Sequence, residues 1–252
     1  MLYLRIECGL SPATLEAYGR DTTDLLEWLA GKDVATHTDI EPRHLADHIT
    51  HLSQERSLAA GTVTRHLSTI RVLCKWMVGI GRLERNPAEI LERPVRWKNL
   101  PDVLSVRQMR SLVEAPTPDA GPLWLRDRTL LELMYASGLR ASEAATSQLA
   151  DINDKLCAIR VTGKGDRQRL VPMGEPAVQW LDRYRSELRP TLEAGKHLDR
   201  GRIFLSKSGR PIDRIAVWRI VTRWARAAGL GHVHPHTLRH SFATHLLEGG
   251  TN

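Results

Sequence analysis

Cysteine is scarce in this chain, and long apolar runs are missing. Cys8, Cys74 and Cys157 are odd in number, widely spaced and outside any metal-binding or redox pattern, so we expect reduced thiols in a cytoplasmic protein. No run of about 18 or more apolar residues occurs, and Arg5 and Glu7 interrupt the first residues. We therefore expect neither a membrane anchor nor a signal peptide. Internal repeats and low-complexity runs are absent from the sequence as well.

The net charge of +7 is distributed unevenly over the 252 residues. Residues 1–98 carry 13 Lys and Arg against 13 Asp and Glu, whereas the other 154 carry 23 against 16. Within the first part, residues 1–54 have 4 basic against 9 acidic side chains, and residues 55–98 have 9 against 4. This predicts a polyanionic partner, contacted by part of a first domain and all of a second. Charge alone leaves DNA, RNA and a membrane surface open.

The first part of the chain predicts helices that begin at Ser11-Pro12, Glu41-Pro42 and Gly61-Thr62, with a short fourth one at Asn86-Pro87. The third has an apolar stripe at helical spacing, made of Val63, Leu67, Ile70, Leu73, Cys74 and Met77. Its opposite face alternates small hydroxyls with cations and has no acidic residue: Thr64, Arg65, Ser68, Arg71 and Lys75. Most such faces are simply solvated, but the lack of acids favours contact with phosphates.

A basic segment with two prolines, residues 93–101, predicts a linker between two domains. Beyond it, helices are expected over 104–112, with Ser105 as the cap, and over 126–137 and 176–189, and Gly138 ends the second of these. Residues 156–162 and 167–171 are β-like and joined by Gly163-Lys164-Gly165-Asp166, which predicts a hairpin with Lys164 at its tip. A cation-rich stretch follows at 201–226, where Arg219 and Arg223 lie one helical turn apart, opposite apolar Val217, Ile220, Val221 and Trp224.

The final stretch predicts a helix that starts at Pro235, stops at Gly249-Gly250 and has Leu238, Phe242, Leu246 and Leu247 as its apolar side. His236, Arg239 and His240 share one face of it. A histidine and a guanidinium at a helix start can receive a phosphate, because free backbone N–H groups point the same way. A plain basic surface helix is the alternative. Five histidines, at 232, 234, 236, 240 and 245, also suggest a metal site, but no His-Glu-x-x-His pattern or nearby cysteine supports it.

Two further motifs decide between these interpretations. They are Ala136-Ser-Gly-Leu-Arg140-Ala-Ser-Glu143 and Thr162-Gly-Lys164-Gly-Asp-Arg-Gln-Arg-Leu-Val-Pro172. Together with His236-x-x-Arg239, they make nearly the whole chain resemble the tyrosine recombinase (phage integrase) family, and its bacterial Xer branch most of all. The resemblance implies a mainly α fold with two domains. Residues 1–92 would form a helical, SAM-like core-binding domain, and residues 102–252 a mostly helical catalytic domain with a small β-hairpin or sheet.

Cleaving a phosphodiester without a metal requires a neutralised phosphate and a protonated leaving group. Arg140 and Arg239 are the candidates for gripping the non-bridging oxygens, since guanidinium stays charged and binds oxygens in pairs. Lys164 can donate a proton to the leaving 5′-oxygen, and His236 can act as acid or base near neutral pH. Glu143 more reasonably orients Arg140 than reacts itself, although a cap or ion pair is equally compatible with its position.

The resemblance implies the same roles for these residues, with Glu143 as the supporting acid. It also implies a transient 3′-phosphotyrosyl link, no cofactor or metal, and double-stranded DNA at a recombination site as substrate. Four protomers, identical or paralogous, would exchange strands through a Holliday junction on the nucleoid, in chromosome dimer resolution or in element integration. Expected DNA contacts are Thr64, Arg65, Ser68, Arg71, Lys75, Arg167, Arg169, Arg219 and Arg223.

The sequence departs from the family in one respect. Its tyrosines are Tyr3, Tyr18, Tyr135 and Tyr184, and none follows the last motif, where the family has its nucleophile. We expect these 252 residues to be a truncated form or fragment of a recombinase that grips phosphate but cannot cleave. A natural, non-cleaving protein that bends or marks DNA, and a DNA- or RNA-binding regulator on the same scaffold, are the alternatives.

Overall fold

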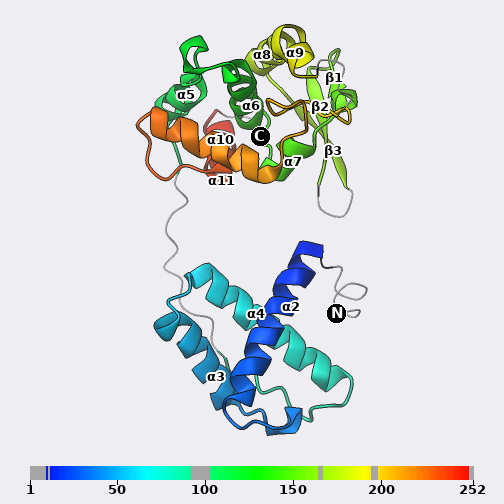
Figure 1. Ribbon diagram of the computed structural model, residues 1–252, viewed down its shortest axis with the longest axis vertical. Helices are drawn as coiled ribbons and strands as arrows, with labels where there is room; N and C mark the ends of the chain where they lie inside the picture. The colour runs from blue at the N-terminus through cyan, green and yellow to red at the C-terminus, as the bar shows by residue number, and fades with distance from the viewer. Residues whose placement is uncertain (1–9, 11, 92–102, 164–166, 194–197, 250–252) are drawn as a thin grey trace. The chain divides into compact units, whose positions relative to one another are not determined.

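The computed structural model describes residues 10, 12–91, 103–163, 167–193 and 198–249. The chain divides into two compact units, Met1–Lys98 and Asn99–Asn252, each with a core of its own. Both are mainly helical, and the second also contains a small antiparallel sheet (Figure 1). This confirms the predicted fold class. The predicted linker, residues 93–101, lies outside the described residues, so the domain limits remain a prediction.

The described part of the first unit contains α2 (Pro12–Ala30), α3 (Pro42–Thr50) and α4 (Ala60–Gly79), with a π-helical turn, His51–Glu55, extending α3. Helix α2 crosses α4 (Figure 1), and Leu25 and Leu29 of α2 pack into the same core as Leu45 of α3. The predicted stripe of α4 is buried as expected, except that Leu73 is only partly buried. The prediction of a helix at Asn86-Pro87 was wrong. The segment forms a turn, in which Asn86 Oδ1 accepts a hydrogen bond from the Ala88 N–H at 3.0 Å.

Helix α6 (Trp124–Ala136) lies at the centre of the second unit, with Leu130, Leu131, Leu133 and Met134 fully buried. Around it are α5 (Val106–Glu114), α8 (Glu175–Arg183), a π-helical turn (Tyr184–Leu188), α9 (Arg189–Glu193), α10 (Arg214–Ala227) and α11 (Pro235–Glu248). Short α7 (Ala141–Thr146) follows α6 directly. The Ser105 hydroxyl caps α5 by accepting from the Gln108 N–H, as its position predicts.

The sheet has the antiparallel order β1 (Ile152–Asn153), β2 (Ala158–Thr162), β3 (Gln168–Pro172). Strands β2 and β3 form the predicted hairpin, with Ile159 opposite Val171 and Val161 opposite Arg169. Ile159 and Val161 face the core. Lys164, at the expected tip, lies outside the described residues.

The apolar side predicted for the last helix was partly wrong. Leu238 is buried, but Leu246 is 45% and Leu247 73% exposed. In the part of the chain that the structure describes, no helix combines the length and apolarity that crossing a membrane requires.

Candidate functional site

A sharp turn between α6 and α7 directs Arg140 outward. Gly138 has φ +56°, and a Cβ there would lie 2.4 Å from Phe242 Cδ1 of α11. Only glycine fits such a position without strain. Leu139 is then buried, while Arg140 occupies the N-cap of α7 with 49% of its side chain exposed. The turn thus places a guanidinium at the surface on a backbone that the core holds in place.

Glu143 is a buried carboxylate that binds two arginines. It accepts from the Arg140 N–H (2.8 Å) and Arg140 Nη1 (2.9 Å), and from Nη1 (3.0 Å) and Nη2 (2.9 Å) of Arg169 on β3. Burial alone would raise the pKa of Glu143, but the Arg169 hydrogen bonds, followed by those from Arg140, outweigh it and lower the pKa to about 2. The carboxylate is therefore ionised near neutral pH and fixes both guanidinium groups.

Helix α11 brings His236 and Arg239 to the same place. Pro235 occupies its first turn, and His234 Nδ1 caps it by accepting from the Thr237 N–H at 3.3 Å. His236 is exposed on this first turn, and Arg239 Nη1 donates to the Gly138 carbonyl. The carbonyl that follows α6 thus anchors a side chain of α11, next to the turn that carries Arg140.

The electrostatics of the cluster favour an anion. Burial lowers the pKa of Arg239, and repulsion from Arg140 lowers it further. Burial also lowers the pKa of His236, with smaller contributions from His234, His240, Arg140 and Arg239. Three guanidinium groups, of Arg140, Arg169 and Arg239, surround the single carboxylate of Glu143, which leaves two positive charges in excess. Such a convergent set matches the non-bridging oxygens of a phosphate.

An open pocket of about 380 Å³ adjoins the cluster, lined by Arg140, Ala141, Ser142, Arg214, Ile215, Trp218, Pro235 and His236. The structure therefore brings together Arg140, Glu143, His236 and Arg239 of the predicted site. Arg169, expected only as a DNA contact, also belongs there as a partner of Glu143. Strand alternation offered a signal, because Arg169 shares its side of β3 with the half-buried Val171.

The structure describes no hydrogen bond between this cluster and the other DNA contacts predicted in the second unit, which are Arg167, Arg219 and Arg223. Arg167 and Arg219 are exposed. Arg223 donates to the buried carboxylate of Asp127 and lies over the Trp224 ring, 4.6 Å from its centroid. Arg223 therefore also helps to join α10 to α6.

In the first unit, the predicted face of α4 is partly engaged within the protein. Arg65 pairs with Asp21 of α2, and Arg71 donates to the Leu91 carbonyl. The hydroxyls of Thr64 and Ser68 donate to the carbonyls of Ala60 (2.7 Å) and Thr64 (2.9 Å), while Lys75 is exposed. An acid from another helix thus balances the charge of Arg65, which the pattern of α4 alone did not show. DNA contact by this face stays a prediction.

Comparison with known proteins identifies the family to which the chain belongs. Residues 102–252 match the model of the phage integrase family, and residues 1–79 match that of its N-terminal SAM-like domain. The chain is 36% identical over 259 residues to the tyrosine recombinase XerD of Corynebacterium glutamicum, covering 100% of this chain and 84% of that protein. It is 39% identical over 247 residues to XerD of Neisseria meningitidis serogroup B, covering 98% and 82%.

Solved structures show the same fold. A lambda integrase dimer (residues 75–356) bound to a COC′ core site matches with a TM-score of 0.74 at 18% identity, over 99% of this chain and 85% of that one. A lambda integrase tetramer bound to a Holliday junction matches with a TM-score of 0.72 at 19% identity, over 99% and 72%.

The two matched family domains, together with the relatives named above, define a DNA strand-transferring class of enzyme. The chain belongs to the phage integrase, or tyrosine recombinase, family. Within that family it is similar to the XerD recombinases.

Proposed function

We propose that this protein is a site-specific DNA recombinase that cuts and rejoins strands through a 3′-phosphotyrosyl intermediate. The observation that carries the proposal is the cluster of Arg140, Arg169 and Arg239 around the one carboxylate of Glu143. A scissile phosphate gains negative charge on its non-bridging oxygens as it becomes pentacoordinate, and preorganised guanidinium groups stabilise that charge. No cofactor is part of this proposal.

Each residue then has a defined part. Arg140 and Arg239 bind the non-bridging oxygens, and Glu143 holds Arg140 in the required orientation from below the surface. Burial lowers the pKa of His236, which favours its neutral form, and the ring can exchange a proton with the attacking hydroxyl. Lys164, by its place in the family motif, protonates the leaving 5′-oxygen.

The proposed partners are double-stranded DNA carrying a recombination site and further recombinase protomers, identical or paralogous, in a tetramer. The DNA-bound dimer and junction-bound tetramer of lambda integrase support this assembly. The likeness to XerD proteins supports chromosome dimer resolution or segregation as the role, in the cytoplasm at the nucleoid.

The tyrosines that the structure describes do not supply an obvious nucleophile. The Tyr135 hydroxyl pairs with His245 Nδ1 at 3.0 Å, and the fully buried Tyr184 hydroxyl accepts from the Leu205 N–H at 3.2 Å. Tyr18 belongs to α2 in the other unit. We propose that the 252 residues alone bind recombination sites without cleaving them. A DNA-binding or regulatory protein on a recombinase scaffold is the alternative.

Nicked duplexes carrying a recombination core test both statements. The 252-residue chain should bind them in a salt-sensitive way and form no covalent adduct on a denaturing gel. A chimera that continues past Asn252 with the C-terminal segment of an XerD relative should form the adduct. An adduct from the 252 residues alone would show that one of their own side chains attacks.

The same chimera tests the arginine site. Arg140→Ala should lower adduct formation by about 100-fold or more, as loss of a donor to a developing oxyanion does elsewhere, while DNA binding is largely kept. Arg110→Ala is the matched control, because Arg110 is an exposed arginine of α5 that pairs only with Glu114 of its own helix among the ion pairs described. Unchanged cleavage by Arg140→Ala would refute the assignment.

A further inference from the structure

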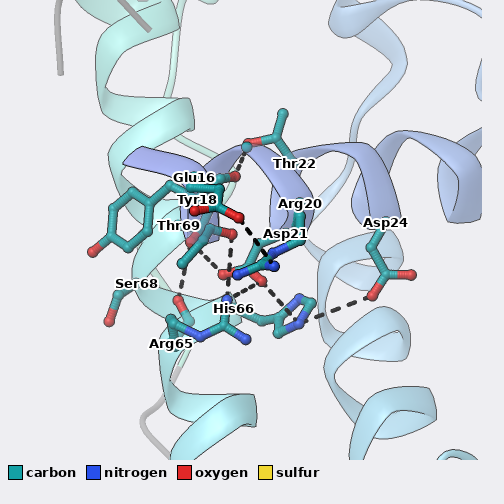
Figure 2. A network of polar contacts seen from close by, with 12 residues as sticks. Glu16, Tyr18, Arg20, Asp21, Thr22, Asp24, Arg65, His66, Ser68 and Thr69 are labelled. Carbon is teal, nitrogen blue, oxygen red and sulfur yellow. Dashed lines mark hydrogen bonds and ion pairs between the residues drawn. The ribbon is translucent and has the colours of Figure 1, made fainter. Parts of the chain in front are cut away.

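Two buried histidines and a carboxylate converge inside the first unit. Asp24 comes from α2, His48 from α3 and His66 from α4, and a potential ligand atom of each lies within 4.8 Å of the other two. His48 is only 1% and His66 5% exposed. Figure 2 shows the His66 ring extending from α4 toward Asp21 and Asp24 on α2.

Several nitrogens of this cluster lack hydrogen-bond partners. Both ring nitrogens of His48 and Nδ1 of His66 are buried without a partner among the described residues. His66 Nε2 lies 3.1 Å from Asp21 Oδ1 and 3.9 Å from Asp24 Oδ2. Leaving polar atoms buried and unpaired costs free energy, so native proteins normally satisfy them. Here the unpaired atoms are imidazole nitrogens of two histidines that lie close to the Asp24 carboxylate.

We propose that Asp24, His48 and His66 form a binding site for a divalent transition-metal ion, with zinc as the best fit. Imidazole nitrogen and carboxylate oxygen are zinc ligands at about 2.0–2.2 Å, and a site with three protein ligands leaves a fourth position for water. The atoms lie close enough for small side-chain movements to bring them to these distances. The site lies in the N-terminal unit and forms no part of the proposed cleavage chemistry.

A second carboxylate, that of Asp21, adjoins the cluster. Asp21 is 3% exposed and receives hydrogen bonds from Thr69 Oγ1 (2.9 Å) and from Arg65. Its Oδ1 lies 3.1 Å from His66 Nε2, the same nitrogen that faces Asp24. Asp21 therefore holds the His66 ring from the side of the proposed ion.

Arg56 would compete with an ion for Asp24. Its Nη1 lies 2.7 Å from both oxygens of Asp24, but the side chain is 44% exposed and can give up one contact to an ion. Since the three ligands come from three helices, a bound ion would cross-link α2, α3 and α4.

The test uses the whole 252-residue chain after removal of metals with a chelator. Titration with Zn²⁺ in a calorimeter should show one ion bound per chain at this site and a raised Tm, and Co²⁺ should give visible absorption bands of a nitrogen- and oxygen-ligated site. Asp24→Asn and His48→Gln should each weaken binding by about tenfold or more.

His240→Gln is the matched control, because His236 and His240 on α11 are an exposed histidine pair that also binds metals in principle. This variant should keep the affinity of the parent. Asp24→Asn preserves shape at a partly exposed position, so it decides the matter if His48→Gln fails to fold, and melting in chelator checks its fold. No binding, binding unaffected by Asp24→Asn, or binding lost in His240→Gln would each overturn the proposal.

Discussion

Glu143 determines how two arginines of the site are held. It is 4% exposed, and its carboxylate receives hydrogen bonds from the backbone and side chain of Arg140 and from both terminal nitrogens of Arg169. A buried carboxylate with such partners contributes to stability as well as to geometry. Protonation of Glu143 at low pH would remove its contribution to stability and its hold on the two arginines together, so the lowered pKa bears on both.

The stability that Glu143 contributes should depend on pH. Its pKa falls from 4.5 to about 2 on folding, so the contribution is fully present above about pH 4.5 and is lost as the pH falls toward 2. The shift corresponds to roughly 3 kcal/mol. Hydrogen exchange of buried α6 amides should therefore show Glu143→Gln less stable than the parent at pH 6, with a gap that narrows toward pH 2.

Glu114→Gln is the control for this measurement. Glu114 is 48% exposed in its ion pair with Arg110, and such pairs contribute at most about 1 kcal/mol. A gap for Glu143→Gln that stays constant between pH 6 and 2 would show that its pKa is not lowered by folding.

Individual residues were predictable where a motif specifies them. Arg140, Glu143, His236 and Arg239 were all expected at one site, and the structure brings them together. The pairing of Arg169 with Glu143 was missed, since 26 positions of sequence separate them and only the β2–β3 register reveals it. Asp24, His48 and His66 come from three different helices, so no local sequence pattern could have shown that cluster either.

At the scale of elements, the turn after α6 connects three parts of the second unit. Gly138 lies between α6 and α7, packs against Phe242 of α11, and offers its carbonyl to Arg239. A substitution at Gly138 should therefore disturb both the packing against α11 and the position of the arginines of the site.

Gly138→Ala should destabilise the second unit by roughly 2–5 kcal/mol, because left-handed backbone strain and overpacking add. It should also weaken DNA binding by displacing Arg140 and Arg239. Thermal unfolding and hydrogen exchange measure the first effect, and gel-shift titration the second.

Gly229→Ala separates the two causes. Gly229 ends α10 with φ +69° and the same pattern of backbone hydrogen bonds as Gly138, but nothing lies within 4 Å of a Cβ placed there. This variant carries the backbone strain without the collision and should lose less stability. Equal losses in the two variants would mean that contact with Phe242 contributes nothing.

Elements with strong end signals were predicted well. Proline in the first turn correctly marked α2, α3 and α11, and Ser105 marked α5. Two-residue β1 was missed, because so short a strand has no alternation to detect. Asn86-Pro87 was mistaken for a helix start because the same residues also begin turns. The exposed Leu246 and Leu247 show that helical spacing does not reveal whether another element covers a face.

At the scale of the whole molecule, the uneven distribution of charge predicts how DNA affinity depends on salt concentration. All of the net +7 belongs to residues 99–252, while residues 1–98 are balanced. Binding through several phosphates releases counterions, so affinity should fall steeply and linearly on logarithmic axes as salt rises. Fluorescence anisotropy on a recombination-site duplex between low and physiological salt measures the slope.

Lys75→Ala should reduce that slope by about one if α4 contacts a phosphate, because Lys75 is an exposed cation. Arg110→Ala, which removes an exposed cation of α5, should leave the slope unchanged. A flat salt profile for the parent would contradict phosphate binding altogether, and an unchanged slope for Lys75→Ala would remove this residue from the DNA contacts.

Arg140, Arg169 and Arg239 come from the start of α7, from β3 and from α11, and intervals of 29 and 70 residues separate them along the chain. No short piece of the polypeptide can therefore hold a phosphate as the folded unit does. A ligand that binds only the folded protein stabilises it, so tighter DNA binding raises the free energy of unfolding in the presence of DNA. The recombination site would thus act on this protein as a stabilising ligand, and the folded population would rise wherever the DNA is present.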